Sequence, residues 1–266
     1  MKKILAIDIG NSNIVIGCFS EETLLFTFRF PTAYSEDSRT LYSKMQSVLT
    51  NRLTDSDELE GSIISSVVPK AARTMKQVLE QLTGRMPLVA GINLETGISL
   101  DRYDKNTLGI DRVIDVVAAK RLYGAPVAVF DLGTATTLSV VDRKGNFLGG
   151  MIASGVQLSI NALSEHTANL PQMKVSTPNR MLGTDTPSNM NSGAVIGTAC
   201  MIDEVISRLP AEIGTKDVPI VITGGLSRTV IPWCRHRINF EPDLLLIGLQ
   251  IVYELNIAEK PRRKEK

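Results

Sequence analysis

The chain has 266 residues, of which 43% are hydrophobic and 21% charged, a globular composition long enough for one large or two small domains of roughly 150 residues. Its 29 Lys and Arg nearly balance its 28 Asp and Glu. We therefore expect no nucleic-acid partner, because proteins that bind duplex DNA usually carry a clustered basic excess. The longest apolar runs, such as 244–252, are about nine residues, which is too short to cross a bilayer.

The cysteines and histidines form no metal-binding pattern. Cys18, Cys200 and Cys234 are scattered without a Cys-x-x-Cys pair, and the chain has two histidines. The N-terminus reaches Asp8 after four apolar residues, too few for a signal peptide. We therefore expect three reduced, mostly buried thiols in a cytoplasmic protein that does not contact a membrane.

Apolar periodicity predicts strands and helices in the first half of the chain. Three short β-rich runs follow one another, and Pro69 and Gly84 bracket one of the later helices. The predicted strands lie at 4–9, 14–19, 23–30 and 61–68, and the predicted helices at 36–53, 69–83 and 111–123.

The second half opens with the same succession of three strands. The predicted strands lie at 127–130, 136–141, 146–152 and 220–223, and the predicted helices at about 156–167, 192–208 and 243–258. The first two of these helices are apolar over a wide arc. Such helices are usually buried on two sides, either by their own domain and a second chain or deep within a monomer.

Two copies of one motif open the two halves. Ala6–Ser12 and Val129–Ala135 are apolar strands that end in Asp-x-Gly and a small polar pair, 123 residues apart. Each copy is followed by two more strands and then helices, so we infer a duplicated α/β domain with a cleft between the copies. The predicted division is 1–118, 119–258 and a solvated charged tail at 259–266.

The Asp-x-Gly turns suit phosphate binding. Gly10 and Gly133 let a phosphate approach the backbone closely, and the hydroxyls and amides that follow can donate hydrogen bonds to its oxygens. Asp8 and Asp131 can supply negative charge for a hydrated Mg²⁺ ion. A single turn of this kind is more often structural, but two matched copies favour nucleotide binding.

A third glycine turn, Thr223–Gly225, ends a β-branched run and enters a predicted helix. The absent side chains would leave room for a base or ribose against the backbone. A tight packing turn explains the same residues, and it is the better interpretation when the turn is taken alone.

These motifs together resemble the type III pantothenate kinases of the acetate and sugar kinase, Hsp70 and actin superfamily. The resemblance covers nearly the whole chain outside the charged tail. It is carried by Asp8–Ser12 with Gly17, Gly109–Arg112, Asp131–Thr137, Gly149–Ile152 and Thr223–Gly225. It implies two duplicated ribonuclease H-like domains, the actin-like ATPase fold, with an interdomain cleft.

The resemblance implies transfer of the ATP γ-phosphoryl group to pantothenate, the first step of coenzyme A biosynthesis. It implies ATP with Mg²⁺, a monovalent cation (K⁺ or NH₄⁺) held by Asp131, and a homodimer that completes the acceptor site. The implied ATP contacts are Asp8, Ile9, Gly10, Asn11, Ser12, Asn13, Ile14, Val15 and Thr134, and the implied pantothenate contacts are Tyr103, Gly109, Ile110, Asp111, Arg112 and Thr186.

Asp111 is the catalytic base that the resemblance implies. Gly109 gives the backbone room, Asp111 can accept the proton of the acceptor hydroxyl, and Arg112 offers a planar fork to a carboxylate or phosphate. Asp111 could equally N-cap the helix that follows it, and the two roles are compatible. The segment that joins Tyr103 to Gly109 is one residue shorter than the family pattern and lacks its Pro.

Two other functions fit the same fold. A relative that phosphorylates another small alcohol, or hydrolyses a phosphoanhydride, would consume ATP in the absence of pantothenate. The other is a non-catalytic accessory factor of transcription. The balanced charge and the absence of a helix-turn-helix pattern in the sequence argue against direct DNA binding by such a factor.

Overall fold

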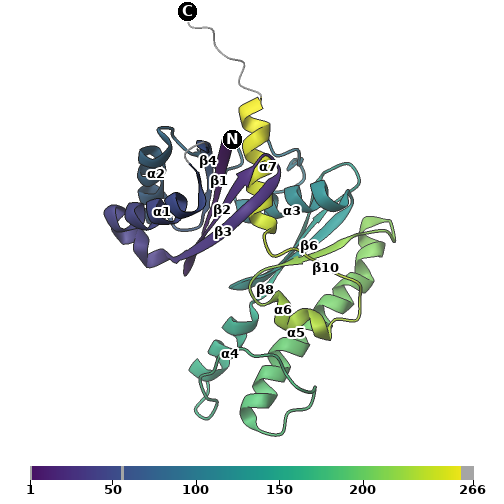
Figure 1. Cartoon of the computed structure of the whole chain (residues 1–266). Coiled ribbons are helices and arrows are strands. Elements are labelled where there is room, and N and C mark those ends of the chain that lie inside the picture. Colours follow the sequence, from purple (N-terminus) through teal and green to yellow (C-terminus); the bar gives the residue numbers. More distant parts are fainter. Residues whose placement is uncertain (1, 55–56, 259–266) are drawn as a thin grey trace, which may run out of the picture. The chain divides into compact units, whose positions relative to one another are not determined.

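The computed structural model describes residues 2–54 and 57–258, so the expected tail at 259–266 lies outside the described residues. The chain forms two compact units, each built around a five-stranded mixed sheet (Figure 1). The first unit contains the chain up to residue 97, residues 108–118 and the residues from 245 on; the second contains 98–107 and 119–244. None of the described helices is long and apolar enough to span a membrane.

The sheet of the first unit has the strand order β3-β2-β1-β4-β5. The first three strands form an antiparallel meander, and β4 and β5 join in parallel beside β1. Two helices pack their apolar stripes on this sheet. The elements are β1 (Lys2–Ile9), β2 (Asn13–Ser20), β3 (Thr23–Pro31), a 3₁₀ turn (Thr32–Glu36), α1 (Ser38–Arg52), β4 (Glu58–Ser66), α2 (Pro69–Thr83) and β5 (Leu88–Val89).

The sheet of the second unit has the order β8-β7-β6-β9-β10. Its first three strands are again an antiparallel meander, and β9 and β10 again add in parallel beside the first strand. The elements are β6 (Val127–Leu132), β7 (Ala135–Val141), β8 (Phe147–Ser154), α4 (Val156–Glu165), α5 (Thr186–Ile213), β9 (Ile220–Thr223), α6 (Ser227–Val230), a 3₁₀ turn (Ile231–Trp233) and β10 (Asn239–Phe240).

The two sheets therefore share one topology, strand for strand. Each begins with the hairpin that carries an Asp-x-Gly turn, β1–β2 in the first unit and β6–β7 in the second. Identical strand order and direction in both units confirm the duplicated α/β architecture that the repeated motif predicts.

The C-terminal helix α7 (Leu244–Ala258) belongs to the first unit from residue 245 on, although the sequence-based division placed it with the second half. Gly248 lies against Ile114 of α3 (Ile110–Tyr123), and Gly61 of β4 lies against the hydroxyl end of the Tyr253 side chain. A Cβ at either glycine would overlap these neighbours. Periodicity marks α7 as a buried helix, but only these contacts decide which sheet it covers.

Helix α5 corrects the predicted helix at 192–208, because it starts six residues earlier and ends five residues later. Asp185 and Ser188 form a capping box at its start, and Gly214 in the left-handed conformation ends it. The first turns are polar and contain Pro187, so the apolar period that marks a helix begins only deeper in the sequence. The helix predicted after Thr223–Gly225 is the single turn α6.

The three cysteines are free thiols, and they differ in burial. Cys200 is exposed on α5, whereas Cys18 in β2 is buried and Cys234 is half-buried. Burial raises the pKa of Cys18 to about 11. The pKa of the Cys234 thiol is raised to about 12, mainly by burial and to a smaller extent by the negative charge of Asp203.

We expect one fast thiol and two slow ones when the folded protein reacts with Ellman's reagent at mildly alkaline pH. Cys200 should react at least about tenfold faster than Cys18 and Cys234, because the thiolate is the nucleophile and burial disfavours it at the other two sites. The Cys200→Ser variant should lack the fast phase. A fast phase that survives this substitution would contradict the assignment.

Candidate active site

The first Asp-x-Gly turn spans Gly10–Asn13: three residues lie between β1 and β2, and Asn13 is the first residue of β2. The Gly10 N–H donates to the Asn13 carbonyl at 3.0 Å, which closes the loop. Thr32 anchors it from outside: its N–H donates to the Ser12 carbonyl at 3.0 Å and its hydroxyl to the Gly10 carbonyl at 2.8 Å. The loop backbone is thereby held while the side chains of residues 11–13 are exposed.

The residues expected to bind ATP divide between this loop and the strands beside it. Asp8 is half-buried opposite Val15, and the neighbouring pair Ile9 and Ile14 is fully buried. The buried pair fixes the hairpin register, which places Asp8 and Val15 on the face of the sheet opposite to Ile9 and Ile14. Thr32 was missed by sequence reasoning, since nothing in its local sequence shows that it reaches back to the loop.

The second turn, Gly133–Ala135, is one residue shorter. The Gly133 N–H donates to the Ala135 carbonyl at 3.1 Å, and the Gly155 N–H donates to the Thr134 carbonyl at 3.1 Å. A Cβ on Gly155 would overlap the carbonyls of residues 133 and 134, so only glycine permits this approach. The exposed Thr134 side chain is thus presented by a rigid loop.

Asp131 lies against the glycine turn that follows β9. Gly224 has φ +98°, and a Cβ there would come within 2.5 Å of the Asp131 carboxylate and 2.6 Å of the Leu132 backbone. Gly225 has open space where its Cβ would be. Gly224 therefore packs tightly against Asp131, which supports the packing interpretation for this residue and ties the third glycine turn to the second Asp-x-Gly motif.

The Gly109–Arg112 motif begins α3. Asp111 is the second residue of the helix, so it is not the N-cap, and its Oδ1 accepts the Arg112 N–H at 2.9 Å. A Cβ on Gly109 would collide with the same Oδ1. Asp111 is half-buried, and Arg112 is buried with 6% of its surface exposed. Gly109 thus leaves room for the Asp111 carboxylate, and the Arg112 amide orients it.

Tyr103 and Thr186, both expected to contact pantothenate, belong to the second unit, whereas Gly109–Arg112 belongs to the first. The Tyr103 ring packs edge-to-face on Phe147, with ring centroids 5.2 Å apart, and passes over Gly149. Thr186 is exposed as the first residue of α5. Asp185 caps this helix, and hydrogen bonds from Ser188 lower the pKa of its carboxyl. The backbone N–H of Ser188 has the larger effect and its hydroxyl the smaller one.

Residues 166–185 lead into Thr186 without any helix or strand, and side chains from α4 and α5 hold their backbone. The Asn191 amide accepts the Ser176 N–H at 3.0 Å and donates to the Ser176 carbonyl at 2.7 Å. The Gln157 amide accepts the Val175 N–H at 2.9 Å and donates to the Met173 carbonyl at 3.0 Å. These two amides replace the backbone pairing of a strand.

The Asn191→Asp variant should loosen residues 172–185, because its carboxylate would face the Ser176 carbonyl where the Asn191 amide donates. We expect a loss of about 1–3 kcal/mol at this buried contact, which is the cost of an unmade hydrogen bond. Limited proteolysis should cut this segment faster than in the wild type. The exposed Asn189→Asp variant is the control, and equal cleavage of both variants would contradict the proposed clamp.

The sequence profile of the type III pantothenate kinase family matches residues 4–208, about three-quarters of the chain. The chain belongs to the type III pantothenate kinase family. Among its relatives, a type III pantothenate kinase from Agathobacter rectalis is 35% identical over 250 residues, covering 94% of this chain and 96% of the relative. A type III pantothenate kinase from Shouchella clausii is 35% identical over 254 residues, which cover 95% of this chain and 99% of the relative.

Solved structures agree on the fold. A protein from Campylobacter jejuni named as a Baf family transcriptional activator aligns with a TM-score of 0.57 at 18% identity, over 96% of this chain and 99% of its own. A ROK hexokinase from Thermus thermophilus aligns with a TM-score of 0.50 at 14% identity, over 97% of this chain and 100% of its own. This type III pantothenate kinase family member thus has the actin-like ATPase fold of two duplicated α/β units.

The carboxylates of this family member suit a metal carried by a nucleotide. Within residues 2–54 and 57–258, no group of three or more His, Cys, Asp and Glu side chains could hold a metal ion by itself. A single carboxylate at a strand end, as at Asp8, fits Mg²⁺, which keeps several waters and takes further ligands from substrate phosphates. The donor set therefore fits Mg²⁺ that arrives with ATP.

Proposed function

We propose that this protein transfers the γ-phosphoryl group of ATP to pantothenate, producing 4′-phosphopantothenate and ADP in coenzyme A biosynthesis. The family profile over residues 4–208 carries the proposal, because it spans both Asp-x-Gly loops and the Gly109–Arg112 motif. Phosphoryl transfer depends mainly on positioning and on compensation of charge. The two anchored loops and the fixed Asp111 carboxylate are suited to these two tasks.

The loop at 10–13 and the strand residues beside it would bind the ATP phosphates. Their exposed amide and hydroxyl groups can donate to phosphate oxygens, while Thr32 keeps the backbone from moving. Asp8 would hold Mg²⁺, which on binding neutralises the charge that develops on the phosphates. Thr134 would add a second contact from the other loop.

Asp111 would act on the acceptor. Its carboxylate takes the proton of the pantothenate hydroxyl as the oxygen forms a bond to the γ-phosphorus and the bond to ADP breaks. Arg112 would pair with a negatively charged oxygen of a substrate, as a planar fork can. Tyr103, Gly109, Ile110 and Thr186 would shape the pantothenate site.

Asp131 would govern the response to a monovalent cation, K⁺ or NH₄⁺. Its carboxylate is held between Gly133 and Gly224, at the end of β6. Asp8 would then serve Mg²⁺ and Asp131 the monovalent cation, because Asp8 adjoins the longer polar loop and Asp131 the shorter one.

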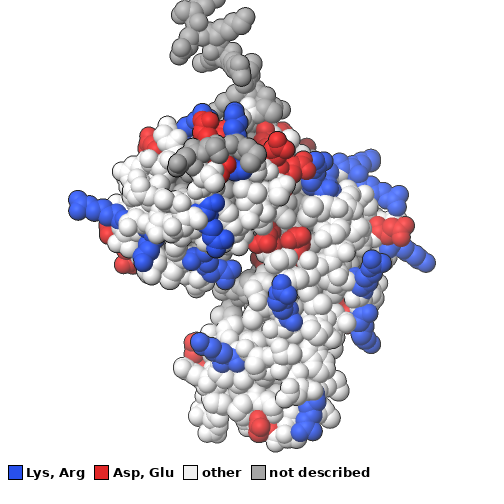
Figure 2. Space-filling view, in the orientation of Figure 1, with Lys and Arg blue, Asp and Glu red and all other residues white. Residues whose placement is uncertain are grey.

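A homodimer would complete the acceptor site. Apolar side chains on β8 and α4 are exposed, including Ile152 at 69%, Leu158 at 46% and Leu163 at 42%. A groove of about 350 Å³ between α4 and α5 continues this apolar surface, and Figure 2 shows few charged side chains over these helices. The buried residues of α4, Val156 and Ile160, face the opposite side. The helix is thus apolar on two sides, and a second copy would bury the outer one.

Mixing two inactive variants tests whether the site is shared between chains. If Asp111→Asn and Thr186→Ala chains are each nearly inactive, their mixture should regain about a quarter of wild-type activity, since half of the random dimers hold one intact site. Asp111→Asn mixed with Arg112→Ala is the control, because both residues belong to the same half-site. No recovery after demonstrated subunit exchange, or a monomer in sizing, would exclude the shared site.

Coupled ATP turnover with and without pantothenate tests the function itself, in Mg²⁺ with K⁺, NH₄⁺ or Na⁺. We expect ADP release that requires pantothenate and rises with K⁺ or NH₄⁺. ADP release that does not depend on pantothenate would favour a hydrolase or a kinase for another alcohol. No turnover under any condition would favour a non-catalytic member of the family.

A further inference from the structure

The register of the first sheet places four residues in one row across the strands. Asp8 in β1 is directly opposite Val15 in β2 and Ser65 in β4, and Val15 is directly opposite Arg29 in β3. Directly opposed residues extend their side chains from the same face of a sheet. Arg29 therefore shares a face with Asp8, the carboxylate proposed to hold Mg²⁺.

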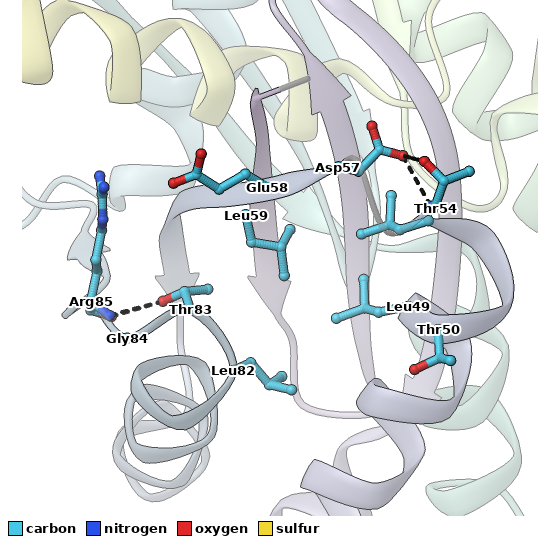
Figure 3. Close-up of a pocket in the computed structure, with 11 residues that line it drawn as sticks. Leu49, Thr50, Thr54, Asp57, Glu58, Leu59, Leu82, Thr83, Gly84 and Arg85 are labelled. Carbon is cyan, nitrogen blue, oxygen red and sulfur yellow. Dashed lines mark hydrogen bonds between the residues drawn. The ribbon is translucent and has the colours of Figure 1, made fainter.

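The other face of this sheet is covered by α1 and α2, which pack their apolar side chains against it. Leu49 of α1, Leu59 of β4 and Leu82 of α2 line a hollow on that side (Figure 3). Because the helices cover that side, the face with Asp8 and Arg29 is the one on which a phosphate group can approach the sheet beside the first Asp-x-Gly loop.

The chain supplies a single positive charge near this loop. Between Lys3 and Arg39 the sequence has no Lys or Arg other than Arg29, and the loop at Gly10–Asn13 is uncharged. ATP with one Mg²⁺ ion keeps a net negative charge, and Asp8 adds another. Because phosphoryl transfer depends on compensation of this charge, phosphates bound here require a positive side chain that the loop does not contain.

The Arg29 guanidinium is open to a ligand. Its side chain is exposed, and it makes no ion pair or side-chain hydrogen bond with any residue in 2–54 or 57–258. The Cα atoms of Asp8 and Arg29 are two strand spacings apart, about 10 Å. A phosphate group fits between a carboxylate and a guanidinium at this separation, with Mg²⁺ about 2.1 Å from its oxygens on one side and N–H donors about 2.8 Å from them on the other.

The second unit has the same row of residues without a positive charge. Asp131 in β6 is directly opposite Thr137 in β7 and Thr223 in β9, and Thr137 is directly opposite Ile152 in β8. Ile152 thus occupies the place that Arg29 occupies in the first unit. The two copies share the Asp and differ at the outer strand, which favours the first copy as the one that binds most of the phosphate charge.

We propose that Arg29 binds the phosphate groups of ATP. Its guanidinium would donate hydrogen bonds to phosphate oxygens from the side opposite to Asp8 and Mg²⁺. This inference rests on the proposed nucleotide site and adds to it a charged residue from a third strand. Arg29 would be a substrate-binding residue, and Asp111 would still take the proton of the acceptor hydroxyl.

Calorimetric binding of MgATP in the absence of pantothenate tests the proposal. We expect Arg29→Gln to raise the Kd about tenfold, the contribution of a hydrogen bond to a charged group. Adenosine lacks phosphates and should bind the variant and the wild type with affinities within about twofold of each other. Arg73→Gln is the control, because it removes the same charge from an exposed position of α2, on the other face of the sheet. The exposed Arg29 side chain should leave the unfolding temperature unchanged when it is replaced.

The outcomes distinguish this inference from the proposed function. Equal MgATP affinities of Arg29→Gln and the wild type, or an equal loss in Arg73→Gln, would overturn the role of Arg29 and leave the proposed kinase activity standing. An equal loss of adenosine affinity would also overturn it, because the lost contact would not be to phosphate. A protein that binds MgATP through Arg29 but does not phosphorylate pantothenate would contradict the proposed function alone. No binding of MgATP by the wild type would overturn both.

Discussion

Replacing Asp111 by Asn should lower turnover by roughly 10²–10⁴-fold while leaving the fold and ATP binding intact, which is the usual contribution of a positioned base. The amide keeps the size of the carboxylate and can still accept the Arg112 N–H, so α3 should start as before. It cannot take the proton of the acceptor hydroxyl. Steady-state turnover, with ATP affinity measured separately, distinguishes a chemical loss from a binding loss.

A second substitution tests whether turnover depends on where the Asp111 carboxylate lies, and not only on its being present. Gly109→Ala would place a Cβ on the Asp111 oxygen and should reduce turnover in the same direction with the carboxylate retained. Asp217→Asn, at an exposed loop position, is the control for loss of one negative charge. Turnover within about twofold of the wild type in Asp111→Asn would remove this residue from the mechanism.

Replacing Gly224 by Ala should destabilise the second unit by about 2–4 kcal/mol. Its φ of +98° is strained for any side chain, and the new Cβ would approach the Asp131 carboxylate and the Leu132 backbone. Because Leu132 and β9 belong to the core of this unit, the clash cannot be relieved at the surface. Thermal unfolding should shift down by roughly 5–15 °C.

The neighbouring glycine provides a matched control. Gly225 has no positive φ and nothing near its Cβ position, so Gly225→Ala should change the unfolding temperature little. If both alanine variants unfold at the same temperature as the wild type, Gly224 does not pack as described. If Gly224→Ala also loses its response to K⁺ while Gly225→Ala retains it, the displaced Asp131 accounts for the loss.

Local sequence determines much of this protein, because much of it depends on neighbours in the chain. Short apolar runs bounded by turn residues place the β1–β2 and β6–β7 hairpins, and each Asp-x-Gly turn occurs where the hairpin reverses. Pro69 and Gly84 delimit α2 by their own backbone preferences. The repeat of one motif also predicts two sheets of equal topology, which the structure confirms.

Tertiary structure decides the features that depend on residues far apart in sequence. Thr32 anchors the first loop and Gly224 packs against Asp131 only because the fold brings these residues together. The early start of α5 depends on a capping box within polar sequence that has no apolar period. Helix α7 carries apolar residues around most of its circumference, so periodicity alone does not identify the sheet that it covers. Close packing with Gly61 and Ile114 places it in the first unit.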